Sequence, residues 1–226
     1  MKKKIVVFSG AGLSAESGLS TFRDQNGLWE NHRVEDVASI EAWYDQRETV
    51  LRFYNLRRKQ LLDVKPNQAH LDIAKLESDF NVVVVTQNVD DLHERAGSKN
   101  IIHLHGELLS ARSSEKESIR FRWEKDILLT DKAPDGSAMR PDIVWFGEGV
   151  PNMEFALKTV EDADFFIVIG TSLQVYPAAN LIYEVPSSCQ CFVIDPHLNL
   201  NQIPKHFELI QKNATEGIKI LMERLQ

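Results

Sequence analysis

IVVFSGAGLSA, residues 5–15, joins a short apolar run to a glycine-rich turn. Residues 5–8 predict a buried strand. The residues after them fit the G-x-G-x-x-G/A turn, whose glycines let backbone N–H groups approach a pyrophosphate at a helix N-terminus. On spacing alone, a tight strand-to-helix turn without a ligand explains the pattern equally well. No clear acidic residue closes a second strand about 20 residues later, as a hydride-transferring Rossmann enzyme needs for its ribose. The usual dehydrogenase layout is therefore disfavoured.

Similar apolar runs recur along the chain and predict further strands. They are residues 82–85, 101–104, 143–146, Phe165–Ile169 and 192–194. Several are apolar at successive positions, as expected of strands that are covered on both faces. Segments of helical period lie between them, at residues 68–76 and Ala178–Tyr183. We therefore predict an α/β fold with a Rossmann-like parallel sheet and helices on both faces.

Two segments break this alternation. Residues 33–62 are charged and helical in period, and residues 110–140 are polar with a turn signal at Pro134-Asp135-Gly136. We expect these two insertions to pack together as a small second domain. The Rossmann-like domain would then consist of residues 1–32, 63–109 and 141–226. A cleft between two such domains is a common place for a ligand.

The composition is that of a soluble globular protein, with 43% hydrophobic and 26% charged residues among 226. The net charge of -7 argues against direct binding of nucleic acid, which depends on clustered Lys and Arg. The first apolar run is too short for a signal peptide and no stretch is long enough to span a membrane, so we expect a cytoplasmic protein. Two cysteines, Cys189 and Cys191, exclude a disulfide framework and make a poor metal site by themselves.

Small or polar residues follow several predicted strands, and ligands of open α/β sheets bind beyond the carboxyl ends of the strands. One of these strand ends reads His103-Leu104-His105-Gly106. The alternation of side chains along a strand puts His103 and His105 on one face. We expect one of them to be structural. A lone histidine more often only satisfies hydrogen bonds than acts in catalysis, but a histidine at a strand end that is followed by glycine, as His105 is, favours a general base. A metal bound by the pair is a weaker alternative, because no further ligand lies at a suitable spacing.

A predicted helix carries a polar pair on its apolar face. Residues 50, 54, 57 and 61 share that face and read Val, Tyr, Arg and Leu. The ordinary explanation is that Arg57 extends to water or pairs with a nearby carboxylate. The alternative is that Tyr54 and Arg57 lie at the bottom of a pocket and bind a ligand carboxylate with two parallel hydrogen bonds.

Taken together, these motifs closely resemble those of the sirtuins, the NAD-dependent protein-lysine deacylases, over nearly the whole chain. The matching segments are residues 10–18 with Thr21-Phe22-Arg23, residues 86–90, residues 103–106, residues 144–148 and residues 170–172. Each segment alone is weak, but chance does not explain all of them in the order of the family.

The resemblance implies a site for NAD as co-substrate and a site for the acylated lysine side chains of proteins. The catalytic residues would be His105, Asn88 and Asp90. Residues that bind NAD would be Gly10, Ala11, Gly12, Ala15, Glu16, Phe22, Arg23, Gln87, Asn88, Val89, Asp90, Gly170, Thr171, Ser172, Asp195 and Ala214. Residues that bind the substrate would be Val144, Phe146, Gly147 and Glu148.

The implied reaction begins when the carbonyl oxygen of the acyl-lysine attacks C1′ of the nicotinamide ribose. Nicotinamide leaves, and His105 then acts as general base on a ribose hydroxyl to move the acyl group to the ribose. Asn88 and Asp90 would position the ribose, and Phe22 would shield the reactive intermediate from water. The products would be lysine, nicotinamide and O-acyl-ADP-ribose. ADP-ribosyl transfer to a protein and NAD binding without catalysis stay open as alternatives, and His105 favours deacylation.

Tyr54 and Arg57 further resemble the branch of the family that removes acidic acyl groups, where such a pair would bind the carboxylate of a succinyl or malonyl group. Two features depart from the family. Most sirtuins bind zinc through two cysteine pairs, whereas residues 110–140 contain no cysteine, so we predict no zinc. Apolar packing would then hold the small domain, through Ile119, Phe121, Trp123, Ile127 and Leu128. Asp195 stands where the family more often has Asn near the adenosine. The sequence does not indicate an oligomeric state.

Overall fold

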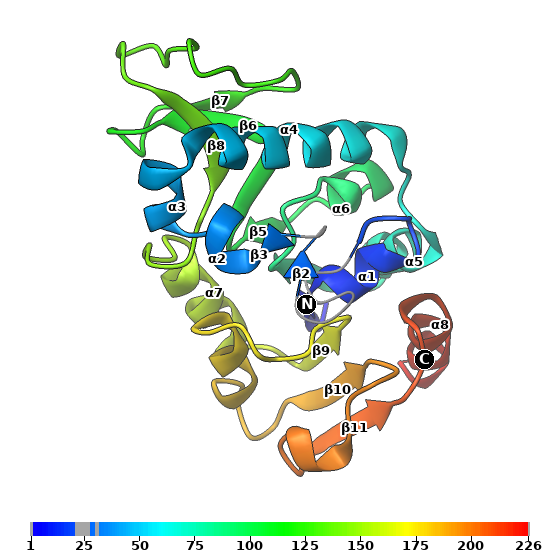
Figure 1. Cartoon of the computed structure of the whole chain (residues 1–226). Coiled ribbons are helices and arrows are strands. Elements are labelled where there is room, and N and C mark those ends of the chain that lie inside the picture. Colours follow the sequence, from blue (N-terminus) through cyan, green and yellow to red (C-terminus); the bar gives the residue numbers. More distant parts are fainter. Residues whose placement is uncertain (1, 21–27, 30–31, 226) are drawn as a thin grey trace.

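Strands and helices alternate through most of the chain (Figure 1). The computed structural model describes residues 2–20, 28–29 and 32–225. The elements are β1 (Lys4–Ser9), α1 (Ala11–Ala15), β2 (Leu28–Trp29), β3 (His32–Arg33), α2 (Val34–Val37), α3 (Ile40–Asp45), α4 (Arg47–Asp63), α5 (Gln68–Lys75), η1 (Leu76–Ser78), β4 (Asn81–Thr86), α6 (Leu92–Ala96), β5 (Ile101–His103), β6 (Gly106–Ser113), β7 (Arg120–Arg122), β8 (Met139–Ile143), α7 (Met153–Val160), β9 (Phe165–Ile169), η2 (Ala178–Tyr183), β10 (Gln190–Ile194), η3 (Leu200–Gln202), β11 (Phe207–Ile210) and α8 (Ala214–Arg224).

A parallel sheet of six strands forms the centre of the larger unit, in the order β11-β10-β9-β1-β4-β5. From β1 the chain passes to β4 and β5 on one side and then returns to β9 on the other. The strand order therefore reverses beside β1, and this is the place where doubly wound sheets bind their ligands. The predicted Rossmann-like α/β fold is confirmed.

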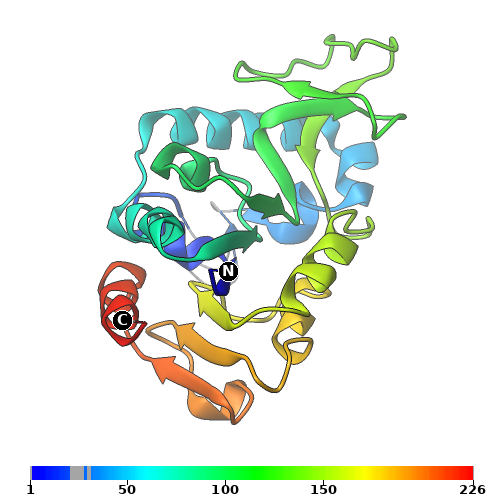
Figure 2. The same cartoon turned by 180° about the vertical axis from the view of Figure 1, so that it is seen from behind.

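Helices cover both faces of this sheet because the central strands are apolar on both faces. Val7 of β1 packs in one core with Ile73 of α5 and Ile218 of α8. Its neighbour Phe8 packs in the opposite core with Ala156 of α7, as the alternation of strand side chains requires. Figure 1 shows α5 and α8 on one side of the sheet and α7 on the other, and Figure 2 shows the same layers from behind.

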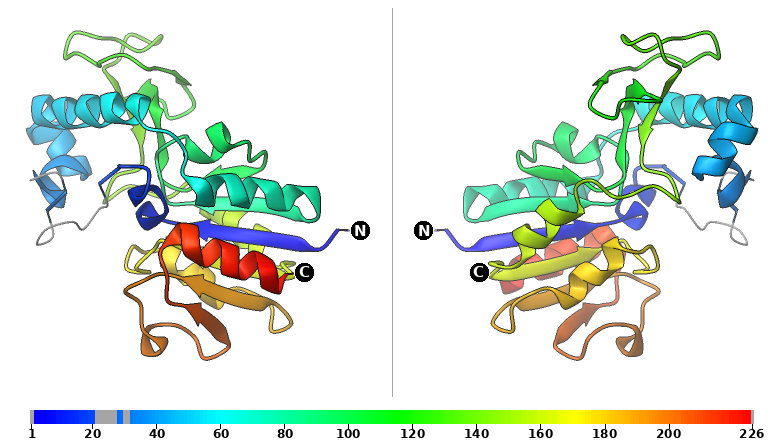
Figure 3. Two further views of the ribbon diagram at one scale, coloured as in Figure 1. Left: turned by 90° about the vertical axis from the view of Figure 1, so that its right-hand side faces the viewer. Right: turned by 90° about the vertical axis from the view of Figure 1, so that its left-hand side faces the viewer.

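The smaller unit combines α2, α3 and α4 with an antiparallel sheet of order β7-β6-β8. Its core contains Trp43, Tyr54, Ile127 and Trp145. In both side views this unit lies above the six-stranded sheet (Figure 3). The expected domain boundaries at residues 109 and 140 fall within β6 and β8. The division into two domains stays a proposal, and we place the second insertion at residues 106–143, so that neither strand is cut.

Several sequence predictions about local structure are wrong. The run at residues 143–146 is not a strand of the central sheet, because β8 ends at Ile143 and pairs antiparallel with β6. β11 has no predicted counterpart, since this edge strand buries only Phe207 and Ile210 fully and so lacks a continuous apolar run. Leu128 is exposed and does not join the small core, although its neighbour Ile127 is buried there.

The remaining expectations concern the cysteines and the membrane. Cys189 and Cys191 are buried and free. Cys191 lies in β10 and packs in the core of the larger unit, like a small apolar residue. Across the part of the chain that the structure describes, no helix has both the length and the apolar composition needed to cross a bilayer.

Candidate active site

A cavity of about 770 Å³ lies at the carboxyl ends of the parallel strands, beside the smaller unit. This volume is within the range of about 300–1,000 Å³ that is usual for small-molecule sites. The cavity is lined by the turn after β1, by the residues after β4, β5, β9 and β10, by α4 and by residues 143–148. All of the predicted site residues within the described ranges line it. Phe22 and Arg23 lie outside the described residues.

Two glycine segments form one wall of the cavity. Gly12 N donates to Gly170 O at 2.8 Å, so the turn after β1 rests on the turn after β9. A Cβ atom at Gly12 would lie 2.9 Å from Gly170 Cα. Gly170 has a φ of +64°, and a Cβ there would lie 2.1 Å from Leu13 N. A side chain at position 12 or 170 would therefore separate the segments, and the surface without side chains fits the close approach of a pyrophosphate.

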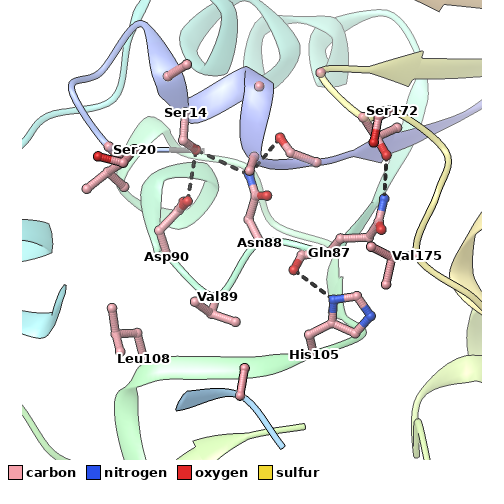
Figure 4. Close-up of a pocket in the computed structure, with 18 of the residues that line it drawn as sticks. Ser14, Ser20, Gln87, Asn88, Val89, Asp90, His105, Leu108, Ser172 and Val175 are labelled. Carbon is pink, nitrogen blue, oxygen red and sulfur yellow. Dashed lines mark hydrogen bonds between the residues drawn. The ribbon is translucent and has the colours of Figure 1, made fainter. Parts of the chain in front are cut away.

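A buried triangle of side chains joins this wall to the end of β4 (Figure 4). Ser14 Oγ donates to Asp90 Oδ2 at 2.8 Å and accepts from Asn88 Nδ2 at 3.2 Å. Asn88 Nδ2 also donates to Gly10 O at 3.1 Å. Burial raises the pKa of Asp90, although its hydrogen bond from Ser14 opposes that shift. Ser14 lies within the glycine motif, but its contact with residues 88 and 90 depends on the pairing of β1 with β4.

His105 lies in the cavity with its ring oriented by the backbone (Figure 4). Its Nδ1 is 3.1 Å from Gln87 O. A carbonyl oxygen only accepts, so Nδ1 carries the proton and the neutral ring keeps Nε2 as a proton acceptor. Burial lowers the pKa of His105, although the bond to Gln87 opposes that shift. The ring is thus neutral near pH 7, as a general base must be.

His103 has a different environment. Its Nδ1 is 3.1 Å from Asn88 O, and its Nε2 is 2.7 Å from Glu94 Oε1. Burial opposes its charged form, but the hydrogen bond and charge of Glu94 outweigh burial and raise the pKa of His103. Within the described ranges, one group of side chains has a spacing that suits a metal ion, and it consists of Glu94, His103 and Glu107. The ion pair of His103 with Glu94 explains why these side chains lie close together. His105 is not part of this group.

The pKa values of the two histidines are expected to be shifted in opposite directions from the ordinary value of about 6.5. The midpoint of His105 should lie below that value, since burial favours its neutral form, and the midpoint of His103 should lie above it, since Glu94 favours its charged form. An NMR titration of the ring protons, assigned through His105→Gln and His103→Gln, measures both. A midpoint of His105 above that of His103 would contradict the two assignments.

Other predicted cofactor residues already have partners inside the chain. Gln87 Nε2 donates to Thr171 Oγ1 at 2.9 Å, which links the end of β4 to the segment after β9. The carboxylate of Glu16 accepts from Thr215 N at 3.0 Å and from Thr215 Oγ1 at 2.7 Å, at the start of α8. Asp195 Oδ1 accepts from two of the backbone N–H groups that follow it, at 2.8 and 3.0 Å. These side chains hold the walls of the cavity together.

Tyr54 and Arg57 line the cavity from α4, one helical turn apart. Tyr54 is fully buried and Arg57 is 8% exposed, so Arg57 does not extend to water, which was one of the two ordinary explanations. Tyr54 Oη accepts from Trp145 Nε1 at 2.9 Å. Burial raises the pKa of Tyr54 far above its usual value, and the phenol stays neutral. Trp145 was not among the predicted site residues, although Val144 and Phe146, which flank it, were assigned to the substrate.

The segment at residues 144–148 crosses from the smaller unit to the larger one. Val144 N donates to His105 O, and Phe146 N donates to Ala38 O, both at 2.9 Å. A substrate strand that pairs with this segment would therefore use other backbone groups of it. Glu148 turns its carboxylate into the smaller unit, where Arg140 donates to it at 2.8 and 2.9 Å. Burial opposes ionisation of Glu148, but Arg140 keeps its pKa below the usual value.

Known proteins are similar to this chain over nearly its whole length. A model of the Sir2 family matches residues 10–177. An NAD-dependent protein deacylase of Helicobacter pylori is 50% identical over 223 residues, which cover 99% of this chain and 97% of that protein. An NAD-dependent protein deacylase of Bacteroides thetaiotaomicron is 49% identical over 231 residues, covering 99% and 98%. The crystal structure of a Sir2 homologue in complex with NAD is similar, with a TM-score of 0.86 and 37% identity over 100% of this chain and 91% of that one.

Proposed function

Because this chain belongs to the Sir2 family and is an NAD-dependent protein deacylase, we propose that its acyl pocket takes acidic acyl groups as well as acetyl groups. The observation that carries this proposal is the position of Tyr54 and Arg57, which are buried and line the same cavity as His105. Acylated lysine side chains of proteins would be the substrates. We further propose that the protein works in the cytoplasm, without binding nucleic acid or membranes.

The described residues fit NAD at the glycine wall and at the triangle of Ser14, Asn88 and Asp90. Gly10, Gly12 and Gly170 would face the pyrophosphate. Asn88 and Asp90 would hold the nicotinamide ribose, and their bonds to Ser14 orient them before any ligand binds. When bound, NAD supplies an electrophilic ribose carbon, C1′, as acceptor for the acyl oxygen.

His105 would move a proton at Nε2. Its Nδ1–H bond to Gln87 O holds the tautomer, and its lowered pKa keeps Nε2 able to accept a proton from a ribose hydroxyl. That proton transfer would raise the nucleophilicity of the hydroxyl, which would attack the acyl carbon so that the lysine amine can leave, and one molecule of water would complete the formation of free lysine and O-acyl-ADP-ribose.

The acyl end of the pocket favours a carboxylate for electrostatic reasons. Arg57 carries a permanent charge, and a guanidinium binds a carboxylate through parallel hydrogen bonds. Tyr54 is a neutral donor one turn away. The carboxylate of Glu148, which also borders the cavity, accepts hydrogen bonds from Arg140 and, at 3.0 Å, from Arg112, so its charge is balanced within the smaller unit. An acetyl group has no terminal carboxylate that could accept from these donors.

Zinc would not be required in this chain. Residues 110–140 include β7 and parts of β6 and β8, and Ile127 is buried in the small core. Arg112 and Arg140 are opposite each other in the β6–β8 pair, and both bind Glu148. We propose that this packing and this buried ion cluster hold the smaller unit together.

The purified protein is therefore expected to contain less than about 0.1 zinc per chain, and EDTA should leave the Tm of unfolding unchanged, because a structural zinc site contributes to folding only where its ligands exist. Elemental analysis and thermal unfolding with and without EDTA measure this. Stoichiometric zinc, or a Tm that falls in EDTA and recovers with zinc, would contradict the proposal.

The acidic-acyl proposal is tested with three peptides of one sequence that carry acetyl-, malonyl- or succinyl-lysine. We expect kcat/KM for the succinyl or malonyl peptide to equal or exceed that for the acetyl peptide at saturating NAD. A butyryl peptide is the matched control, since it has about the length of a succinyl group but no charge. Equal turnover of the butyryl and succinyl peptides would contradict the proposal, because the terminal carboxylate would then contribute nothing.

A further inference from the structure

Trp145 connects the acyl pocket to the core of the smaller unit. It follows β8, it is buried, and it lines the cavity. Its Nε1 donates to Tyr54 Oη at 2.9 Å, and the two rings are 6.1 Å apart at an angle of 41°. The bond joins residues that are 91 positions apart in the chain.

Several groups fix the indole of Trp145. The guanidinium carbon of Arg140 lies 3.5 Å from the centre of the indole, and the ring of Trp43 lies 5.4 Å from it. Trp145 N donates to Glu148 Oε2 at 2.8 Å, and Glu148 in turn accepts from Arg140. The indole N–H therefore has a set direction, because its ring, its backbone and the group that covers it belong to one cluster.

The direction of this bond determines what the phenol offers to a ligand. A phenol hydroxyl has one proton and can accept through its lone pairs. An indole N–H only donates, so the bond from Trp145 uses a lone pair of Tyr54 and cannot take its proton. Burial keeps the phenol neutral, so the proton is retained. Tyr54 then meets a ligand as a donor, beside the donors of Arg57.

We propose that Trp145 is a positioning residue for acyl selectivity, which orients the Tyr54 hydroxyl to donate to the terminal carboxylate of an acidic acyl chain. This inference rests on the proposed acidic-acyl activity. A carboxylate accepts from several donors at once and suits such an arrangement. An acetyl group has no terminal carboxylate, so its turnover should not depend on the bond from Trp145 to Tyr54.

The test compares Trp145→Phe, Tyr54→Phe and the double variant on succinyl- and acetyl-lysine peptides. Trp145→Phe keeps an aromatic ring and removes the N–H. The ratio of kcat/KM for succinyl over acetyl should fall about tenfold, as expected for one hydrogen bond that acts on a charged ligand, and the loss should appear in KM. In the Tyr54→Phe background the same change should leave the ratio within about twofold, because the bond is already absent. Trp123→Phe, whose Nε1 donates to Asp126 O away from the cavity, is the matched control.

A second measurement does not depend on the folding of the tryptophan variant. The indole N–H resonance of Trp145 in the unaltered protein is identified as the one that moves most in Tyr54→Phe. Addition of a succinyl-lysine peptide should shift this resonance, and the acetyl-lysine peptide should shift it less.

The outcomes separate this inference from the function on which it rests. If the unaltered protein does not turn over the succinyl peptide, the acidic-acyl activity itself is overturned, and the role of Trp145 with it. If Tyr54→Phe lowers the succinyl-to-acetyl ratio and Trp145→Phe does not, the activity stands and the inference about Trp145 is overturned. Additive losses in the double variant also overturn the inference about Trp145. So does an indole N–H resonance that neither peptide shifts.

Discussion

Replacement of His105 by Ala is expected to lower kcat for deacylation by about 10²–10⁴-fold, the range that a positioned general base contributes. The imidazole is held by Gln87 O and has a lowered pKa, so its loss removes the proton acceptor from the cavity. The Kd for NAD should change by less than about threefold, because the proposed pyrophosphate wall consists of backbone at positions 10, 12 and 170. Steady-state kinetics and calorimetric titration with NAD measure the two effects.

The matched control is His206→Ala, which removes an exposed imidazole that does not line the cavity. Its kinetics should equal those of the unaltered protein. His105→Ala with kcat within about tenfold of the unaltered protein would exclude the general-base role, because the loss would be below what general-base catalysis contributes.

Replacement of Arg57 by Met is expected to lower kcat/KM for a succinyl-lysine peptide about 30-fold or more relative to the acetyl peptide. Met has a similar length and no charge. Loss of one partner from a buried, hydrogen-bonded charge pair costs about 2–5 kcal/mol, and about 1.4 kcal/mol is a factor of ten. The measurement is kcat/KM for both peptides at saturating NAD.

Arg52→Met provides the control on the same helix, since Arg52 is exposed on α4 and does not line the cavity. It should leave the succinyl-to-acetyl ratio unchanged. Full desuccinylase activity in Arg57→Met would show that the carboxylate of the acyl group is bound elsewhere. The assignment of α4 as the helix that binds this carboxylate would then be wrong.

The central strands could be predicted from the sequence because they are buried on both faces. β1, β4 and β9 are continuous apolar runs, and no local feature competes with them. The turn after β1 could be predicted for the same local reason, since its glycines are adjacent in the chain. β11 could not, because an edge strand with exposed positions lacks that signal.

Partners of a strand are not encoded in its local pattern. Residues 143–146 have the composition of a strand, yet Ile143 ends β8 and the next residues leave the sheet towards the cavity. The roles of Trp145 and Ser14 were missed for a related reason. Each side chain acts on residues far along the chain, Trp145 on Tyr54 and Ser14 on Asp90, and only the packing of the two units or the pairing of β1 with β4 brings them together.

The Tyr54–Arg57 pair shows where pattern and packing had to be combined. The helical period put both residues on the apolar face of one helix, but it could not decide between a buried and a solvent-exposed Arg57. The exposed fraction of 8% decides it, because β6 and β8 of the same unit pack against this face of α4. For Glu148 the sequence motif predicts contact with the substrate, but packing directs its carboxylate to Arg140.

The most direct test is to incubate the protein with NAD and an acylated lysine peptide, and to quantify nicotinamide, O-acyl-ADP-ribose and the mass of the protein. Deacylation predicts equal amounts of nicotinamide, O-acyl-ADP-ribose and free peptide, none of them formed from an unacylated peptide, and a protein of unchanged mass. Nicotinamide release without an acylated lysine, with the mass of ADP-ribose added to a protein, would contradict it.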